Sequence, residues 1–300
     1  MNIQKWINNN AHSLVGKTVA ITGSTGGLGK EICKCLVSLG ADLILLDRNE
    51  QASDAHRSSL ISQNPNVNVK CLHVDLEDVI SVIRATEMLK TLDIDFFVHN
   101  AGAYSIPRHI TAVGYDNVFT INFISPYYMI RELLPQLRAR GGKILAVGSI
   151  AYKLSNVDEN DVDFRTRRAA SLVYGNAKRY LMFSLLEMFK DEKRADLSIV
   201  HPGITPTNII SHYPKLVYAV IKYPMKLVFI SPQKASLSII SGLFDTCSNN
   251  EWIGPRHFEV WGFPKKRRLA SCSRNEKEFI ASTADSICER IKNLSAYTVG

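Results

Sequence analysis

The sequence contains no uninterrupted apolar run of about 18 residues, the length that a membrane-spanning helix needs. Its first residues, MNIQKWINNNAHSLVG, also lack the apolar segment and small-residue cleavage site of a secretory signal. Because of these absences, the sequence predicts neither a membrane-spanning helix nor a secretory leader. We therefore expect a cytoplasmic protein, with peripheral attachment to a membrane left open.

Regularly spaced cysteines are missing as well. The six cysteines show no CxxC spacing and accompany no histidine cluster; they are Cys33, Cys35, Cys71, Cys247, Cys272 and Cys288. Disulfide frameworks and zinc sites need closer or more regular spacing. The pattern predicts reduced thiols in a reducing compartment, and we expect no metal site.

The chain has no stripe of interleaved aromatic residues and arginines of the kind that nucleic-acid binding uses. Its formal net charge is +8 and its pI about 9.1, but the basic run KKRR at 265–268 is short. A basic surface on a globular protein accounts for this charge, so we expect no nucleic-acid partner.

No internal repeat or low-complexity linker divides the 300 residues, of which 46% are hydrophobic and 21% charged. A chain of this length and composition can bury a sizeable core. The simplest prediction is a single domain over residues 1–300.

Short apolar runs alternate with helical patterns from Thr18 onward. Runs continuous in Val, Ile and Leu predict buried strands at residues 18–22, 42–47, 69–75, 95–100, 143–149 and 197–203. Helical spacing with a glycine stop is seen in Leu28, Ile32, Leu36, Leu39 and Gly40. Strands that alternate with helices favour right-handed βαβ units. The sequence predicts an α/β fold, a doubly wound parallel Rossmann-type sheet of about seven strands with helices on both faces.

Two further elements are predicted near the C-terminus. HFEVWG, residues 257–262, favours a seventh strand, and residues 275–294 favour a closing helix. The apolar side of that helix would contain Phe279, Ile280, Ile287, Ile291 and Leu294.

The stretch TGSTGGLG, residues 22–29, joins the first predicted strand to the first predicted helix. Glycine permits a sharp turn and a close backbone approach to phosphate, and the N–H groups and dipole of a helix N-terminus favour an anion. Ligands of such sheets lie outside the carboxyl ends of the strands. The stretch therefore predicts a pyrophosphate cradle.

Asp47 stands at the end of the second predicted strand. Its carboxylate can accept both ribose hydroxyls of an adenosine and would repel a 2′-phosphate, which indicates NAD. The guanidinium of Arg48 could instead stack on adenine or bind that phosphate. Because Ser24, Thr25 and Gly26 add no basic group, the sequence favours NAD and leaves NADP open.

The stretch YGNAK, residues 174–178, places a tyrosine and a lysine four positions apart. On a helix these positions share one face, so the Tyr174 phenol and the Lys178 ammonium can enter one site. The spacing is common on helices, and the other motifs decide its meaning.

Taken together, the ordered motifs resemble the short-chain dehydrogenase/reductase family over about residues 15–265. TGSTGGLG fits the family's TGxxxGxG, and it also fits the TGxxGxxG of the extended, sugar-nucleotide branch. HNAGAY, residues 99–104, is similar to the classical NNAG element, with His99 where asparagine is usual. HPG, residues 201–203, is similar to the PG turn after the sixth strand.

The resemblance implies four catalytic residues, Asn122, Ser149, Tyr174 and Lys178. Tyr174 would be the acid in reduction and the base in oxidation, and Lys178 would lower its pKa and bond the nicotinamide ribose. Ser149 would hold the substrate oxygen, and Asn122 would anchor a water that links Lys178 to solvent. The cofactor-binding residues that the resemblance implies are Gly23, Ser24, Thr25, Gly27, Leu28, Gly29, Asp47, Arg48, Asp75, Leu76, Asn100, Ala101, Gly102, Tyr174, Lys178, Pro202, Gly203, Ile204 and Thr205.

Two segments are similar to those of retinol-dehydrogenase-like members: the 24 residues between Ser149 and Tyr174, and the long apolar stretch after the PG turn. Ala177 departs from the serine that is frequent before the lysine. We expect residues 204–230 to form a flap over the substrate, and its apolar character predicts a lipophilic alcohol, ketone or aldehyde, such as a retinoid, steroid or fatty carbonyl.

The basic residues within 213–230 also allow this segment to contact a membrane surface as an amphipathic helix, although an ordinary lid explains them equally well. Family members are often homodimers or homotetramers, and either state is compatible with this sequence.

The predicted function is that of an NAD(P)-dependent oxidoreductase that interconverts an alcohol and a ketone or aldehyde. One alternative is an extended-type sugar-nucleotide epimerase or dehydratase, which would need a larger C-terminal domain than the residues after Gly203 provide. The other is a non-catalytic dinucleotide-binding regulator, which would have no need to keep Ser149, Tyr174 and Lys178.

Overall fold

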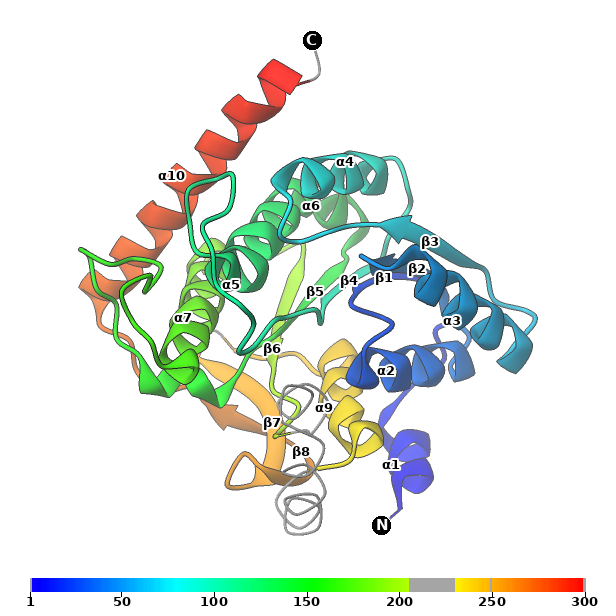
Figure 1. The fold of residues 1–300 in the computed structure, drawn as a ribbon. Helices are drawn as coiled ribbons and strands as arrows, with labels where there is room; N and C mark the ends of the chain where they lie inside the picture. Colours follow the sequence, from blue (N-terminus) through cyan, green and yellow to red (C-terminus); the bar gives the residue numbers. More distant parts are fainter. Residues whose placement is uncertain (1, 205–229, 249, 299–300) are drawn as a thin grey trace, which may run out of the picture.

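The protein is described here from a computed structural model that covers residues 2–204, 230–248 and 250–298. The strands form one sheet in the order β3-β2-β1-β4-β5-β6-β7-β8, as Figure 1 shows. They are β1 (Thr18–Thr22), β2 (Asp42–Asp47), β3 (Val69–His73), β4 (Phe96–His99), β5 (Lys143–Val147), β6 (Asp196–Val200), β7 (Glu251–His257) and β8 (Trp261–Arg268). All neighbours pair in parallel except β7 and β8. The predicted doubly wound α/β fold is confirmed, with eight strands.

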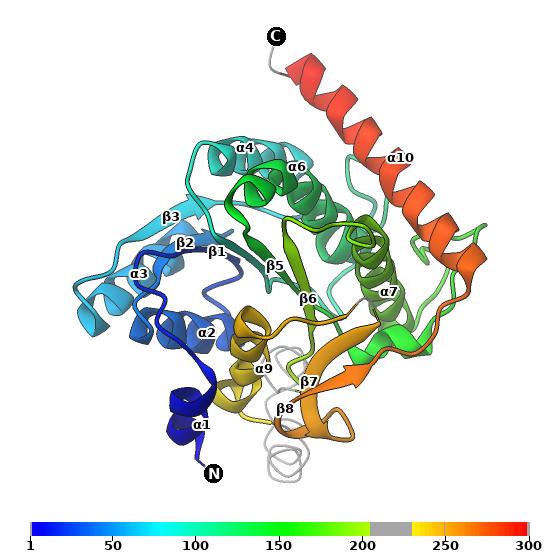
Figure 2. The same ribbon diagram turned by 180° about the vertical axis from the view of Figure 1, so that it is seen from behind.

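Helices cover both faces of the sheet (Figures 1 and 2). One face is covered by α2 (Gly27–Ser38), α3 (Glu50–Gln63) and α9 (Pro232–Phe244), with α1 (Ile3–Asn10) packed beside α9. The other face is covered by α4 (Val79–Lys90), α6 (Ser125–Arg140) and α7 (Ala170–Met188), with α10 (Arg274–Thr298) packed on α7. Short helices precede α6 and follow β5: α5 (Asn117–Phe119), the π-helix η1 (Thr120–Ile124) and the 3-10 helix η2 (Ile150–Leu154).

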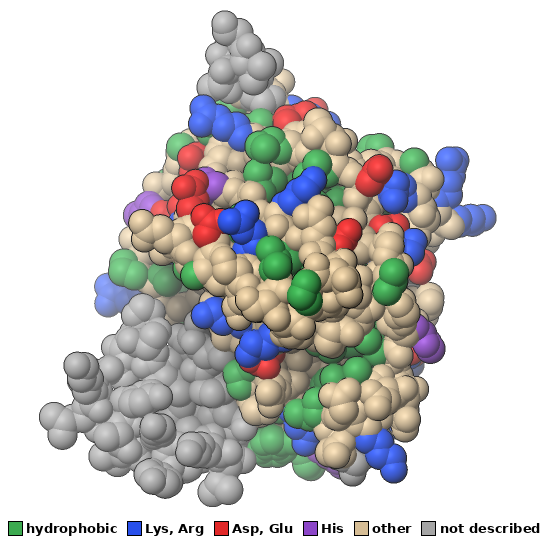
Figure 3. All heavy atoms as spheres, turned by 90° about the vertical axis from the view of Figure 1, so that its right-hand side faces the viewer, with side chains coloured by type: hydrophobic (Ala, Val, Ile, Leu, Met, Phe, Trp, Pro, Cys, Tyr) green, Lys and Arg blue, Asp and Glu red, His purple; other side chains and the backbone are tan. Residues whose placement is uncertain are grey.

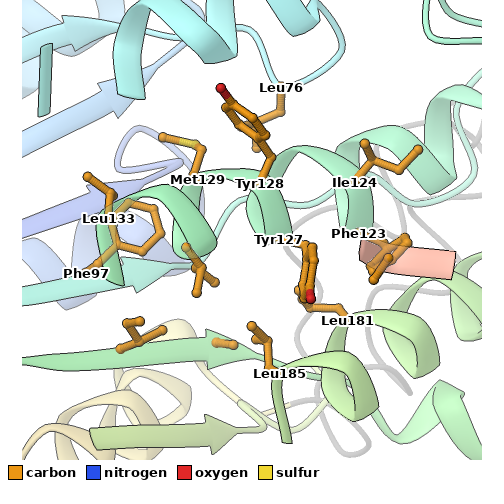
Figure 4. Close-up of a cluster of buried hydrophobic side chains, with 14 of the residues drawn as sticks. Leu76, Phe97, Phe123, Ile124, Tyr127, Tyr128, Met129, Leu133, Leu181 and Leu185 are labelled. Carbon is orange, nitrogen blue, oxygen red and sulfur yellow. The ribbon is translucent and has the colours of Figure 1, made fainter. Parts of the chain in front are cut away.

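A large apolar core lies between the sheet and the helices α4, α6 and α7. Figure 4 shows Phe97 of β4 and Met129 and Leu133 of α6 in this layer, with Leu181 and Leu185 of α7 on its other side. All five side chains are fully buried. Burial of an apolar side chain of this size contributes about 1.5–3 kcal/mol. This packing fixes α7, and with it the YGNAK stretch, against the sheet.

The predicted C-terminal strand at residues 257–262 is wrong. This stretch is the turn of the β7–β8 hairpin: β7 ends at His257 and β8 begins at Trp261. Phe258 and Glu259 have φ of 52° and 60°, a left-handed conformation that is rare for residues other than glycine. Neither residue is a typical turn former, so the alternation of apolar side chains concealed the turn.

The other predicted elements correspond closely to the structure. The helix expected at residues 275–294 is α10, in which Ile280, Ile287 and Ile291 are buried and Leu294 is exposed. Gly40, the expected stop of the first helix, has φ of 88°. Among the described residues, no helix combines the length and the apolar character needed to cross a bilayer.

Candidate active site

Most of the predicted site residues meet at the carboxyl ends of β1, β4 and β5, where the strand order reverses between β1 and β4. The glycine-rich turn follows β1, Asn100–Gly102 follow β4, and Ser149 follows β5. Asn122 lies in η1, and Tyr174 and Lys178 lie on α7. The crevice at such a reversal is where ligands bind in open α/β sheets.

Tyr174, Lys178 and Ser149 form one contacting group. The Ser149 hydroxyl lies close enough to the Tyr174 phenol to lower its pKa. The Lys178 Nζ lies 5.7 Å from the centre of the Tyr174 ring and donates a hydrogen bond of 2.9 Å to the carbonyl of Val147. The helical spacing of YGNAK therefore does place phenol and ammonium on one face.

Asn122 is fully buried in the π-helix η1. Its Oδ1 accepts from the Ala103 N–H at 3.2 Å, and its Nδ2 donates to the carbonyls of Ala103 and Val118 at 2.8 Å each. A Cβ added to Gly102 would lie 2.8 Å from Asn122 Oδ1 and 3.7 Å from Lys178 Nζ. Asn122 thus holds the loop after β4 against Lys178, and only glycine fits at position 102.

Burial shifts the pKa values of the two titratable groups in opposite directions. It raises the pKa of the Tyr174 phenol to about 12, with the Ser149 hydrogen bond opposing the rise and Tyr104 adding to it. It lowers the pKa of Lys178 to about 7. We expected Lys178 to lower the pKa of Tyr174. Desolvation dominates instead, because burial disfavours the charged phenolate of Tyr174 and also the charged ammonium of Lys178 that would stabilise it.

The glycine-rich turn has the backbone that a pyrophosphate requires. Gly23 has φ of 70°, and a Cβ on Gly29 would lie 2.1 Å from the Gly23 carbonyl oxygen. Gly26 caps α2 without any side-chain hydrogen bond, so the first N–H groups of the helix have no side-chain acceptor. Helix N-termini of this kind bind phosphate groups, and the residues present fit a dinucleotide.

Asp47 is buried, and its carboxylate is already hydrogen-bonded. Its Oδ1 accepts from Thr25 N at 3.1 Å and Thr25 Oγ1 at 3.0 Å, and its Oδ2 accepts from the hydroxyls of Ser24 and, at 3.1 Å, Ser53. Ser24 and Thr25, both predicted to bind cofactor, therefore point their side chains toward Asp47. The adjacent Arg48 is exposed.

The loop after β4 is joined to β1 through Thr22, a residue that the sequence analysis did not select. Thr22 Oγ1 accepts from the N–H groups of Asn100 and Ala101 at 3.1 and 3.0 Å. Asn100 Nδ2 donates to the carbonyls of Thr22 and Gly23 at 3.1 and 3.0 Å. Asn100 therefore supports the glycine-rich turn.

His99 also contacts Thr22, with its Nδ1 3.1 Å from Oγ1. Since that hydroxyl accepts twice from backbone N–H groups, its own proton is directed to His99 Nδ1, and the imidazole carries its proton on Nε2. Nε2 has no hydrogen-bond partner among the described residues. Burial, together with the charge of Lys178, lowers the pKa of His99 well below its usual range.

Tyr104 is a second residue that the sequence analysis did not select. Its ring meets the Tyr174 ring edge to face, with centroids 5.4 Å apart. It directly follows the glycine and alanine of the HNAGAY motif, but neither spacing nor periodicity indicates that its ring would reach α7.

The remaining predicted cofactor residues lie around this centre. Asp75 follows β3, and its Oδ1 accepts from Glu77 N at 3.0 Å, while Leu76 is buried in the core. Leu28 packs on the opposite face of the sheet. After β6, Gly203 has φ of 87° and the Ile204 carbonyl accepts from Ile230 N at 3.0 Å. Thr205 and all of the predicted flap between Ile204 and Ile230 lie outside the described residues, and so does the predicted membrane-contact segment except for Ile230.

Comparison with known proteins agrees with this geometry. The model of the short chain dehydrogenase family matches residues 17–159. The chain is 27% identical to short-chain dehydrogenase TIC 32 A of Brassica napus over 221 residues, 67% of this chain and 68% of that protein. It is 24% identical to human retinol dehydrogenase 13 over 206 residues, 67% of this chain and 62% of that protein.

Among solved structures, an uncharacterized protein from Mycobacterium paratuberculosis superposes with a TM-score of 0.71 at 21% identity, covering 95% of this chain and 96% of that one. At this identity the likeness establishes the fold.

Proposed function

Because the chain belongs to the short-chain dehydrogenase/reductase family of NAD(P)-dependent oxidoreductases, we propose that it interconverts an alcohol and a ketone or aldehyde by acid–base catalysis at Tyr174. The contact between Tyr174, Ser149 and Lys178 at the end of β5 carries this proposal. A nucleotide-binding regulator would have no need to keep the phenol of Tyr174 next to the Ser149 hydroxyl and the buried Lys178.

Tyr174 donates its proton to the substrate oxygen in reduction and takes it back in oxidation. Ser149 lies within hydrogen-bonding reach of the phenol, so its hydroxyl can donate to the same oxygen and stabilise the charge that develops there. The nicotinamide, when bound, supplies or accepts the hydride.

Lys178 replenishes the proton of Tyr174. With a pKa of about 7, the Lys178 ammonium can lose a proton near neutral pH and the resulting amine can regain one. The Val147 carbonyl fixes the position of this group. Asn122 uses its side chain to hold Ala103, which keeps the Gly102 backbone beside Lys178. The water that Asn122 was expected to anchor stays a prediction.

We propose NAD as the cofactor, held by the turn from Gly23 to Gly29 and by Asp47. Three of the four donors to Asp47 are hydroxyls that can rotate away, so ribose hydroxyls can take their place. A 2′-phosphate would lie beside a buried carboxylate, which costs free energy. NADP is the alternative, since exposed Arg48 could pair with that phosphate.

The proposed substrate is lipophilic. The similarity to retinol dehydrogenase 13, named for an apolar alcohol, supports this class, as does the apolar sequence of residues 204–230. Homodimers or homotetramers, and a membrane contact through 213–230, stay predictions.

The test is the variant Tyr174→Phe, which removes only the phenolic hydroxyl. Reduction of decanal, a steroid ketone and all-trans-retinal is followed by the loss of NADH absorbance. Turnover should fall by at least about 100-fold, because a general acid contributes that much or more. NADH affinity, measured by fluorescence titration, should change little.

Tyr180→Phe is the matched control, because Tyr180 lies on the same helix and its hydroxyl has no hydrogen-bond partner among the described residues. It should keep full turnover. If Tyr174→Phe turned over as fast as this control, the mechanism would be wrong; NADH binding without turnover in the unaltered protein would favour the non-catalytic regulator.

A further inference from the structure

The β7–β8 hairpin ends the sheet, and its turn projects beyond the strands (Figure 1). β8 pairs only with β7, and no other described strand pairs with its outer side. Residues 258–260 form the turn, with His257 opposite Trp261. Of the three turn residues, Phe258 is exposed, whereas Glu259 and Val260 are half-buried.

Aromatic side chains occupy the turn. Phe258 is 83% exposed and Trp261 is 40% exposed, and their rings meet edge to face with centroids 6.5 Å apart. Charged residues on an edge strand are explained by protection against edge-to-edge pairing. Exposed Phe and Trp have the opposite effect, since they promote association. The aromatic pair therefore requires another explanation.

The two strands of the hairpin carry more basic than acidic residues. Between residues 251 and 268 stand two acidic residues, Glu251 and Glu259, and five that are Lys or Arg: Arg256, Lys265, Lys266, Arg267 and Arg268. Within the described part of the chain, no carboxylate pairs with Arg256, Lys265 or Arg268. The face at the β3 end of the sheet differs, because basic and acidic side chains intermingle there (Figure 3).

The turn also lies beside the segment that leaves the active site. A Cβ on Gly203, which follows β6, would lie 2.9 Å from the Val260 carbonyl oxygen. Glu259 accepts from Lys153 Nζ at 2.5 Å, and Lys153 belongs to η2, directly after Ser149. The hairpin therefore contacts both the segment that follows β6 and the η2 helix that follows Ser149.

We propose that the β7–β8 hairpin docks on an anionic lipid surface. Phe258 and Trp261 enter the boundary between headgroups and acyl chains, where amphipathic aromatic rings are favoured. Arg256 and Lys265, the basic residues of the hairpin nearest to its turn, bind the lipid phosphates through electrostatic attraction. Docking would present the site to substrates dissolved in the bilayer, a consequence that rests on the proposed lipophilic substrate.

Charge alone would also suit a nucleic acid, but the aromatic pair favours lipid. Bases stack on open, flat ring faces. Here the two rings meet edge to face at 86°, at the tip of a narrow hairpin. This arrangement inserts into a soft boundary more readily than it provides a platform for stacking.

The test is sedimentation of the full-length protein with vesicles, without substrate or coenzyme. Vesicles of equimolar phosphatidylcholine and phosphatidylserine should bind the protein, and phosphatidylcholine vesicles should bind it at least about tenfold more weakly. Added salt should weaken the binding. A blue shift of tryptophan emission should accompany it, because Trp6 and Trp252 are buried and Trp261 is exposed.

Two variants of the hairpin separate the contributions. Arg256→Gln/Lys265→Gln should weaken binding about fivefold for each charge removed. Phe258→Ser should weaken it by about tenfold or more, since the exposed ring loses its apolar contact. Lys70→Gln/Arg84→Gln is the matched control: it removes two exposed charges from β3 and α4, far from the hairpin (Figures 1 and 2), and should bind as the unaltered protein does.

Absence of binding, equal binding to neutral vesicles, or full binding by Phe258→Ser would overturn the proposal. Salt-sensitive binding of single-stranded polyuridylate with no vesicle binding would assign the hairpin to nucleic acid instead. The Tyr174→Phe variant should bind vesicles normally, so a failure of the catalytic mechanism would leave this result unaffected.

Discussion

At the scale of single residues, the proposed function gives two tasks to the carboxylate of Asp47. It orders the turn through Ser24 and Thr25, and it stands where the second strand ends, the position that reads an adenosine ribose. A buried carboxylate that holds the phosphate-binding turn also opposes any additional negative charge beside it. In the proposed function, phosphate binding and cofactor selection are therefore linked through this one side chain.

Asp47→Ala should shift cofactor preference from NADH toward NADPH, by on the order of tenfold in the ratio of dissociation constants, because it removes a charge that repels a 2′-phosphate. Affinity for NADH should also fall, since the turn loses its anchor. Fluorescence titration with both cofactors measures this. Asp54→Ala, which removes a carboxylate exposed on α3, is the control, and an unchanged ratio in Asp47→Ala would show that Asp47 does not select the cofactor.

At the scale of elements, α10 is fastened to the catalytic helix α7 by a largely buried ion pair. Arg179 donates from Nε to Glu276 Oε1 at 2.5 Å and from a terminal nitrogen to Glu276 Oε2 at 2.8 Å. The same guanidinium donates to the Tyr152 carbonyl at 3.2 Å. Because Arg179 follows Lys178, this pair fixes the helix that carries Tyr174 and Lys178, the residues proposed to be catalytic.

Glu276→Gln should lower the free energy of unfolding by about 3 kcal/mol, because it leaves the Arg179 guanidinium buried without its counter-charge. Urea denaturation measures the change. Glu278→Gln, two residues along α10, breaks an exposed pair with Arg274 and should change stability by less than about 0.5 kcal/mol. Equal effects of the two substitutions would contradict the role given to Glu276.

At the scale of the whole molecule, buried histidines limit stability in acid. Burial lowers the pKa of His201 to about 4, with Glu259 opposing the shift, and it also lowers the pKa of His99 well below its usual range. Both side chains are buried, His201 against the Trp252 ring at 5.1 Å. Below pH 6.5 the unfolded chain takes up protons at these positions while the folded protein does not. Stability is therefore complete above that pH and is lost as the pH falls toward 4.

The contribution of His201 can be measured with His201→Phe, which keeps an aromatic ring on Trp252 but cannot take up a proton. Between pH 6 and 4, roughly the window of the His201 shift, its unfolding free energy should fall less steeply, by about 1.4 kcal/mol per pH unit. Comparison at pH 8, where the histidines are neutral, separates packing losses from protonation. Identical slopes for the two proteins would mean that His201 titrates normally in the fold.

The sequence by itself determined the order of strands and helices, the glycine-rich turn and the shared face of Tyr174 and Lys178. These are consequences of local periodicity and local backbone preference, which a short stretch of chain carries without its neighbours. The same local signal failed at residues 257–262, where Phe258 and Glu259 turn the chain against their own preferences.

Only the tertiary structure decided the contacts between distant segments. Thr22 holds the loop after β4, Tyr104 reaches Tyr174, and Arg179 pairs with Glu276, which lies 97 positions away. The pKa values of Tyr174 and Lys178 belong here too, because burial sets them and burial is a property of the assembled core. So does the place of Arg256 beside the exposed aromatic turn, since the hairpin pairs His257 with Trp261. Such contacts depend on which surfaces meet, and no periodicity along the chain records that.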